Sequence, residues 1–127
     1  NTSYDKVFKR TSKLIKQATS KGFDWSNNTR CFVKVEEEIA ELKEALENKD
    51  LNHVKEELGD VIFTLFSFAR LSNLDIIEAL EFANKKFDKR FKKLSEILNE
   101  RGIDLKSLSD KEKEELWQKS KLANKTI

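Results

Sequence analysis

Two pairs of carboxylates at helical spacing are the residues of this sequence best suited to chemistry. Glu38 and Glu41 lie in the stretch EEEIAEL, and Glu57 and Asp60 lie in EELGD. Residues three apart share one face of a helix, and like charges placed there weaken the helix by roughly 0.2–0.5 kcal/mol. We therefore expect each pair either to be screened by water or to have a positive group between its members.

The four carboxylates can converge on one site if their two helices form an antiparallel hairpin. Carboxylate oxygens are the hard ligands that Mg²⁺ prefers, and Mg²⁺ usually keeps waters and takes its remaining ligands from phosphates. A single acidic pair at this spacing is usually a solvated surface, but two pairs on facing edges favour a site. The pattern indicates a magnesium site open to a phosphorylated ligand, with Mn²⁺ as a substitute.

Histidine and cysteine chemistry has little support. A di-iron carboxylate bundle needs Glu-x-x-His on each of two helices, and His53 is the only histidine, so that class is excluded. We interpret His53 as an ordinary residue at a helix start. Cys31 is the only cysteine, which rules out an intramolecular disulfide and favours the cytoplasm, with Cys31 as a small apolar packing residue.

A basic band, NKKFDKRFKK, supplies a second set of candidates. Lys86 and Arg90 lie four residues apart on one helix face. A lysine point charge beside a bidentate arginine fork suits a polyphosphate. A solvated basic face explains the band about equally well, because lysines are plentiful in this segment.

The elements that position these residues are predicted to be helices. The composition is 38% hydrophobic and 38% charged, with no proline and three glycines, which is typical of an all-α protein. Apolar periodicity and capping signals predict five helical segments, at about residues 2–20, 28–48, 51–72, 74–101 and 109–121. We expect one domain over residues 1–127, a bundle of four main helices plus a C-terminal helix.

The second and third helices carry the carboxylates. Val35, Ile39, Leu42 and Leu46 form the expected buried stripe of the second helix, and Glu38 and Glu41 flank it. The third helix is apolar nearly all round from Val61 to Leu71, so we expect a subunit interface there, in a dimer or a dimer of dimers. Gly59 suggests a close approach. The apolar run is about half of the roughly 20 residues that a membrane span needs, so no membrane anchor is expected.

Taken together, EEEIAEL, EELGD and NKKFDKR resemble the MazG family of all-helical nucleoside triphosphate pyrophosphohydrolases. The family signature is E-E-x-x-E, a variable spacer, then E-x-x-D. Glu37, Glu38 and Glu41 match the first part, and Glu57 and Asp60 match the second. The resemblance covers about residues 22–101.

The resemblance implies hydrolysis of an NTP or dNTP to the monophosphate and pyrophosphate. By that resemblance, the Mg²⁺ ligands are Glu38, Glu41, Glu57 and Asp60, with Glu38 and Glu41 as catalytic residues and Glu41 as a base. Lys86 and Arg90 would bind phosphates, and Trp25 would stack on the base. Lys34 is a weaker phosphate candidate, because it can pair with Glu38 four residues on.

Two other classes compete with this interpretation. A non-catalytic helical dimerisation or regulatory module would use its charges only for solubility, and it should gain no thermal stability from Mg²⁺ and nucleotide. A nucleic-acid binder is disfavoured, because the net charge is only +2 and the acidic clusters would repel phosphates.

Overall fold

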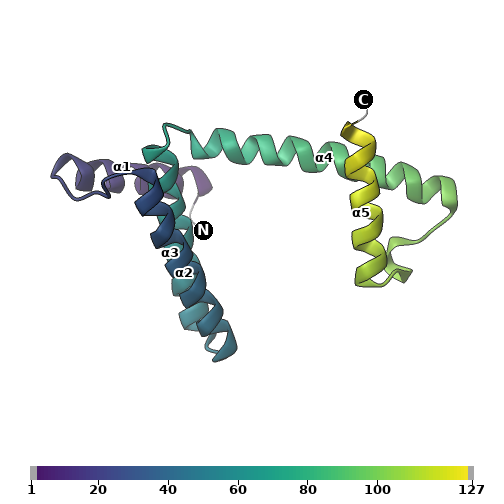
Figure 1. The fold of residues 1–127 in the computed structure, drawn as a ribbon, viewed down its shortest axis with the longest axis horizontal. Coiled ribbons are helices and arrows are strands. Elements are labelled where there is room, and N and C mark those ends of the chain that lie inside the picture. Colours follow the sequence, from purple (N-terminus) through teal and green to yellow (C-terminus); the bar gives the residue numbers. More distant parts are fainter. Residues whose placement is uncertain (1–2, 126–127) are drawn as a thin grey trace. The chain divides into compact units, whose positions relative to one another are not determined.

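The computed structural model describes residues 3–125 and confirms the all-α class. Over these residues there are five α-helices, one 3₁₀ helix and no strand (Figure 1). Their bounds are α1 Tyr4–Ser20, α2 Asn28–Glu47, α3 Leu51–Leu71, α4 Ile76–Arg101, η1 Leu105–Ser107 and α5 Asp110–Lys125. The predicted start of the first helix at Thr2 lies outside the described residues. The 3₁₀ turn was not predicted, and α5 continues four residues beyond the expected end.

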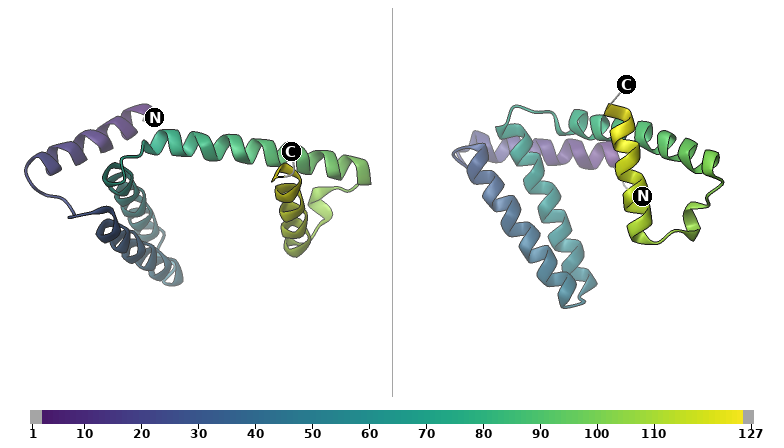
Figure 2. Two further views of the ribbon diagram at one scale, coloured as in Figure 1. Left: turned by 45° about the horizontal axis from the view of Figure 1, so that its top comes forward. Right: turned by 45° about the vertical axis from the view of Figure 1, so that its right-hand side comes forward.

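The chain divides into two compact units, one ending at Ile76 and the other starting at Ile77. In the first unit, α2 and α3 form an antiparallel hairpin (Figures 1 and 2). The first helix contacts α3 through Phe8 and Phe66, whose ring centroids are 5.7 Å apart. The prediction of one domain over the whole chain is not tested by this division.

Local caps fix where the two helices of the hairpin begin. The Asn27 side chain accepts a hydrogen bond from the Arg30 N–H at 2.9 Å, and Asp50 accepts one from the His53 N–H at 3.3 Å. Such caps satisfy backbone donors that a helix start leaves free. Lys49, between the helices, has a φ of 57°. Because a cap fixes the first turn, it also fixes the direction in which Glu38 and Glu57 project.

The face of α2 that packs on α3 differs from the predicted stripe. Val35 is buried, but Ile39 and Leu46 are 50% and 63% exposed. Burial extends instead along Cys31, Val35, Glu38 and Ala45. The small Cys31 and Ala45 side chains favour a close approach of α3 on this side, so the contact is rotated toward Glu38.

Gly59 does not serve a close approach within the chain, since a Cβ placed there would meet no atom within 4 Å. That prediction was therefore wrong for the chain described here. No helix within residues 3–125 has both the length and the apolar character needed to cross a membrane.

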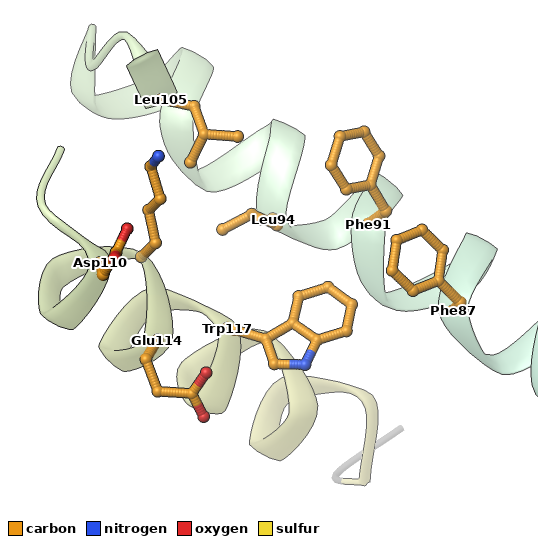
Figure 3. Close-up of a pocket in the computed structure, with 8 residues that line it drawn as sticks. Phe87, Phe91, Leu94, Leu105, Asp110, Glu114 and Trp117 are labelled. Atoms are coloured by element: carbon orange, nitrogen blue, oxygen red, sulfur yellow. The ribbon is translucent and has the colours of Figure 1, made fainter. Parts of the chain in front are cut away.

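In the second unit, α4 and α5 enclose a small core of Leu94, Leu98 and Leu116, with Trp117 half-buried beside it. The sequence pattern of the last helix predicts Leu116 and Trp117 as its docking residues, and this prediction is confirmed. Helical spacing predicts that the earlier apolar residues of α4 also point inward, but in the described chain they stay 43–57% exposed: Ile77, Leu80, Phe87 and Phe91. An open groove of about 300 Å³ runs between these helices, with Phe87, Phe91 and Trp117 in its wall (Figure 3).

Candidate metal centre

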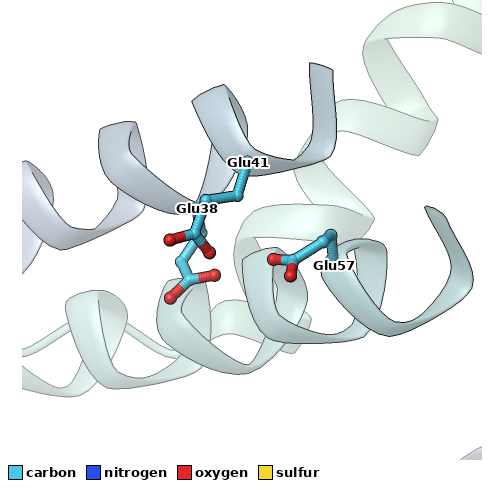
Figure 4. Close-up of side chains that lie close together, drawn as sticks. All are labelled: Glu38, Glu41 and Glu57. Carbon is cyan, nitrogen blue, oxygen red and sulfur yellow. The ribbon is translucent and has the colours of Figure 1, made fainter. Parts of the chain in front are cut away.

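Three of the four predicted carboxylate ligands converge on one point of the hairpin. Glu38 and Glu41 project from α2 and Glu57 projects from α3 (Figure 4). One carboxylate oxygen from each residue lies within 4.8 Å of the others. The convergence predicted from the spacing of the two acidic pairs is therefore present for these three residues.

Two of the three carboxylates are buried. Glu38 and Glu57 are each 7% exposed, whereas Glu41 lies at the exposed edge of the cluster. The Oε2 atoms of Glu38 and Glu57 are buried and have no hydrogen-bond partner. Burying an oxygen of an ionised carboxylate without a partner is costly, because the charge loses its hydration. The cluster thus presents two hard oxygen donors that lack a positive partner.

The other oxygen of each buried carboxylate is already engaged. The Lys34 ammonium lies 3.0 Å from Glu38 Oε1, and His53 Nε2 lies 3.2 Å from Glu57 Oε1. Both contacts span one helical turn, from a residue to the fourth residue after it. Lys34 also lies 3.7 Å from Glu37 Oε2. The pairing of Lys34 with Glu38 that the sequence suggested is present.

These contacts move the pKa values of the cluster in opposite directions. The hydrogen bond from Lys34 lowers the pKa of Glu38, even though burial opposes this effect. The same bond raises the pKa of Lys34. The negative charge of Glu38, with the Glu57 carboxylate also close by, raises the pKa of Glu41. Three adjacent carboxylates therefore compete for positive charge, which either a proton or a cation can supply.

The donor set agrees with a hard divalent cation. Oxygen donors and net negative charge suit Mg²⁺ or Mn²⁺, while zinc sites usually include nitrogen or sulfur. The buried, unpartnered Oε2 atoms of Glu38 and Glu57 are the observation that supports such a fit. Glu41 at the open edge leaves one side of the cluster accessible to a ligand from solvent.

Asp60 is not part of this group of three. It lies one turn after Glu57 and is exposed, while Val61 and Thr64 occupy the buried positions of the next turn. Its carbonyl oxygen accepts a hydrogen bond from Thr64 Oγ1 at 2.8 Å. A role for the Asp60 carboxylate in metal binding stays a prediction.

The other predicted residues lie in different elements. Trp25 is half-buried in the loop before α2, and its backbone N–H donates to Asp24 Oδ1 at 2.8 Å. Asp24 in turn forms an ion pair with Arg70 of α3, which ties this loop to the hairpin. Lys86 and Arg90 belong to α4 in the second unit.

Arg90 already has an aromatic partner. Its guanidinium carbon is 5.9 Å from the centroid of the Trp117 ring on α5, a cation–π distance. Lys86, one turn earlier on α4, is exposed to solvent. Phosphate binding by either residue stays a prediction.

His53 makes a contact that the sequence interpretation did not predict. It was assigned to an ordinary helix start, yet its ring contacts one of the three cluster carboxylates. The spacing contained the signal, because His53 precedes Glu57 by four residues just as Lys34 precedes Glu38. Pairs at this spacing are neighbours on a helix surface.

The fold and the site together define a class of protein, in which an all-α hairpin carries a cluster of carboxylates. Residues 27–95 match the MazG nucleotide pyrophosphohydrolase domain. This match covers more than half of the 127 residues, so the chain belongs to the MazG family.

Named relatives agree with this assignment. The chain is 37% identical over 114 residues to the nucleoside triphosphate pyrophosphohydrolase/pyrophosphatase MazG of Thermotoga maritima, covering 90% of this chain and 44% of the relative. It is 32% identical over 114 residues to the nucleoside triphosphate pyrophosphohydrolase of Escherichia coli K12, covering 88% of this chain and 43% of the relative. The chain therefore spans less than half the length of either relative.

Proposed function

We propose that this chain hydrolyses nucleoside triphosphates, either NTPs or dNTPs, to the monophosphate and pyrophosphate in a Mg²⁺-dependent reaction. The observation that carries the proposal is the meeting of Glu38, Glu41 and Glu57, with two buried carboxylate oxygens left unpartnered. The names of the relatives point to the same reaction. Glu38, Glu41, Glu57 and Asp60 would hold the cation.

The cation, when bound, would neutralise charge on the substrate phosphates and favour attack by water on phosphorus. Glu38 and Glu57 would bind the cation and orient it. Each carboxylate is buried, and one of its oxygens is held by a neighbouring side chain, Lys34 or His53. Glu41 is the residue placed to move a proton. It lies at the exposed edge of the cluster, where a water molecule can reach its carboxylate. The bond to the departing pyrophosphate breaks as the water oxygen bonds to the α-phosphorus.

The remaining substrate contacts follow the family pattern. Lys86 and Arg90 supply positive charge for the phosphates, with Arg90 able to bind two phosphate oxygens at once. Trp25 offers a ring for stacking on the base. Lys34 is engaged with Glu38, so a phosphate contact from Lys34 would have to coexist with that ion pair.

The proposal includes a homo-oligomer and a cytoplasmic location. Leu58, Ile62 and Phe63 of α3 are 42–47% exposed in the single chain, which supports the interface expected on this helix. A reducing compartment agrees with a buried, unpaired Cys31.

A pyrophosphate-release assay tests the reaction. The wild type is assayed with all eight common NTPs and dNTPs, in Mg²⁺, in Mn²⁺ and in EDTA, beside Glu38→Gln and Glu44→Gln. Glu44 is an exposed glutamate of α2 outside the cluster, so its substitution is the matched control. We expect metal-dependent release that falls at least about a hundredfold in Glu38→Gln, as for loss of a group acting in the transition state, and is unchanged in Glu44→Gln.

Other results would contradict the proposal. Release that persists in EDTA would remove the metal from the reaction. Equal losses in both variants would indicate a general effect of charge. The absence of release with every nucleotide would favour the non-catalytic helical module instead.

A further inference from the structure

The two buried glutamates of the cluster are held in the same way on different helices. On α2, Lys34 contacts Oε1 of Glu38 at 3.0 Å, and on α3, His53 contacts Oε1 of Glu57 at 3.2 Å. In both residues the opposite oxygen, Oε2, is buried and has no partner. The sequence repeats a basic residue followed four positions later by a glutamate on each side of the hairpin.

We propose that Lys34 and His53 are paired positioning residues, which fix Oε1 of Glu38 and Glu57 so that both Oε2 atoms are presented to a divalent cation. A carboxylate is planar, so fixing one oxygen by a hydrogen bond restricts the direction of the other. Partners outside the metal shell are known to orient metal ligands in this way. The proposal rests on the metal-dependent function proposed above and adds two residues that act through Glu38 and Glu57.

Burial distinguishes these contacts from ordinary surface pairs. The Glu38 and Glu57 side chains are each 9% exposed, while their partners Lys34 and His53 are 39% and 47% exposed. Lys92 and Asp88 have the same four-residue separation on α4, but their side chains are 74% and 67% exposed. Exposed pairs of that kind contribute little, because water competes for both groups. At Glu38 and Glu57 water has little access, so the nitrogen donor determines where the carboxylate lies.

Charge and positioning make different demands on Lys34. As a positive group beside the cluster, it should weaken cation binding by repulsion. As an anchor for Glu38, it should strengthen cation binding. A comparison between two neutral replacements separates these effects, because glutamine keeps a hydrogen-bond donor at similar reach and leucine does not.

The test measures Mn²⁺ binding alone, by calorimetric titration and by the electron paramagnetic resonance signal of free Mn²⁺. The proteins are the wild type, Glu57→Gln, and glutamine and leucine variants at positions 34, 53 and 43. Lys43 is an exposed lysine of α2 with no contact to the cluster among those described, which makes it the matched control. Circular dichroism and thermal unfolding in EDTA check the fold, and alanine variants replace any leucine variant that fails to fold.

We expect Lys34→Leu and His53→Leu to bind Mn²⁺ about tenfold more weakly than Lys34→Gln and His53→Gln, the lower end of the range for partners of metal ligands. The two variants at Lys43 should bind alike. Equal binding by the glutamine and leucine variants at 34 and 53 would overturn the positioning role. If Glu57→Gln weakens binding in the same experiment, the metal site itself is still supported. Failure of the wild type to bind Mn²⁺ would overturn both this proposal and the metal-dependent function.

Discussion

Among single residues, Glu41 is the one whose charge should lower the stability of the metal-free fold while serving the proposed reaction. In the metal-free chain the charges of Glu38 and Glu57 raise its pKa. A raised pKa means that the folded chain binds this proton more tightly than the unfolded chain. The favourable contribution to folding is therefore complete below the unfolded pKa, and it is lost as the pH rises through the raised value. At neutral pH the ionised Glu41 opposes folding.

Glu41→Gln should consequently raise the thermal unfolding temperature in EDTA at pH 7, because it removes one of three repelling charges. The gain should shrink as the pH is lowered through the raised pKa of Glu41, because the wild-type carboxyl then becomes protonated. Mg²⁺ should stabilise the wild type and have a weaker effect on the variant. Differential scanning calorimetry with and without Mg²⁺ measures all three effects.

Glu44→Gln provides the control for net charge, since Glu44 lies on the same helix but outside the cluster. If Glu41→Gln lowers the unfolding temperature in EDTA, the carboxylates do not repel as the geometry indicates.

The sequence alone predicted only part of the carboxylate cluster. Periodicity placed Glu38, Glu41 and Glu57 correctly, because three-residue and hairpin spacing are local constraints. The same reasoning could not separate Asp60 from the others, since its exposure depends on the rotation of α3 against α2. It also missed the contact of His53 with Glu57.

At the scale of elements, the close contact between α2 and α3 is what brings the carboxylates together. Ala45 is fully buried on the contacting face of α2. Ala45→Leu should force the helices apart, with a cost in unfolding free energy of about 1–3 kcal/mol. The same displacement should weaken Mn²⁺ binding, because Glu57 would move away from Glu38 and Glu41. Urea denaturation and Mn²⁺ titration measure the two effects.

Ala40→Leu is the matched control, because Ala40 is an exposed alanine of the same helix. Equal stability of the two leucine variants would mean that the packing at Ala45 is loose.

The start of α5 allows a pH-dependent prediction. The Ser109 N–H donates to Glu112 Oε1 at 2.9 Å, and the Glu112 N–H donates to Ser109 Oγ at 3.2 Å. The first bond lowers the pKa of Glu112 below its ordinary value of 4.5. A lowered pKa contributes stability above the unfolded value, and this contribution is lost as the pH falls through the lowered value.

Wild type should therefore be more stable than Glu112→Gln at pH 7, and this advantage should disappear as the pH falls below about 4. Thermal unfolding of both proteins between pH 7 and pH 3 measures the difference. Glu115→Gln serves as the control, because Glu115 is exposed on the same helix. A difference that stays constant over the whole range would remove the ionised cap as its cause.

Element boundaries were easier to predict than element faces. The helices α2, α3 and α5 start within one residue of the predicted positions, because the signals that begin a helix are local in sequence. Burial depends on the partner helix, which periodicity cannot identify. For that reason Ile39 and Phe87 were expected to be buried and are instead exposed in the described chain.

At the scale of the whole molecule, exposed apolar side chains on α3 are the basis for predicting self-association. Leu58, Ile62 and Phe63 belong to the helix that carries Glu57, and each is more than 40% exposed. Large apolar side chains exposed on one helix favour an interface, because their exposure to water is unfavourable. Covering them with a second copy would also stiffen the hairpin that holds the cluster.

Light scattering at micromolar concentration should therefore give the mass of a dimer or a dimer of dimers, and Ile62→Glu should lower that mass. The charge would be placed in a desolvated interface without a partner, which is strongly unfavourable. Since Ile62 is already 44% exposed in the single chain, the fold should survive the substitution. Lys55→Glu, an exposed position of the same helix, should leave the mass unchanged. A monomeric wild type would show that the apolar face of α3 serves another purpose.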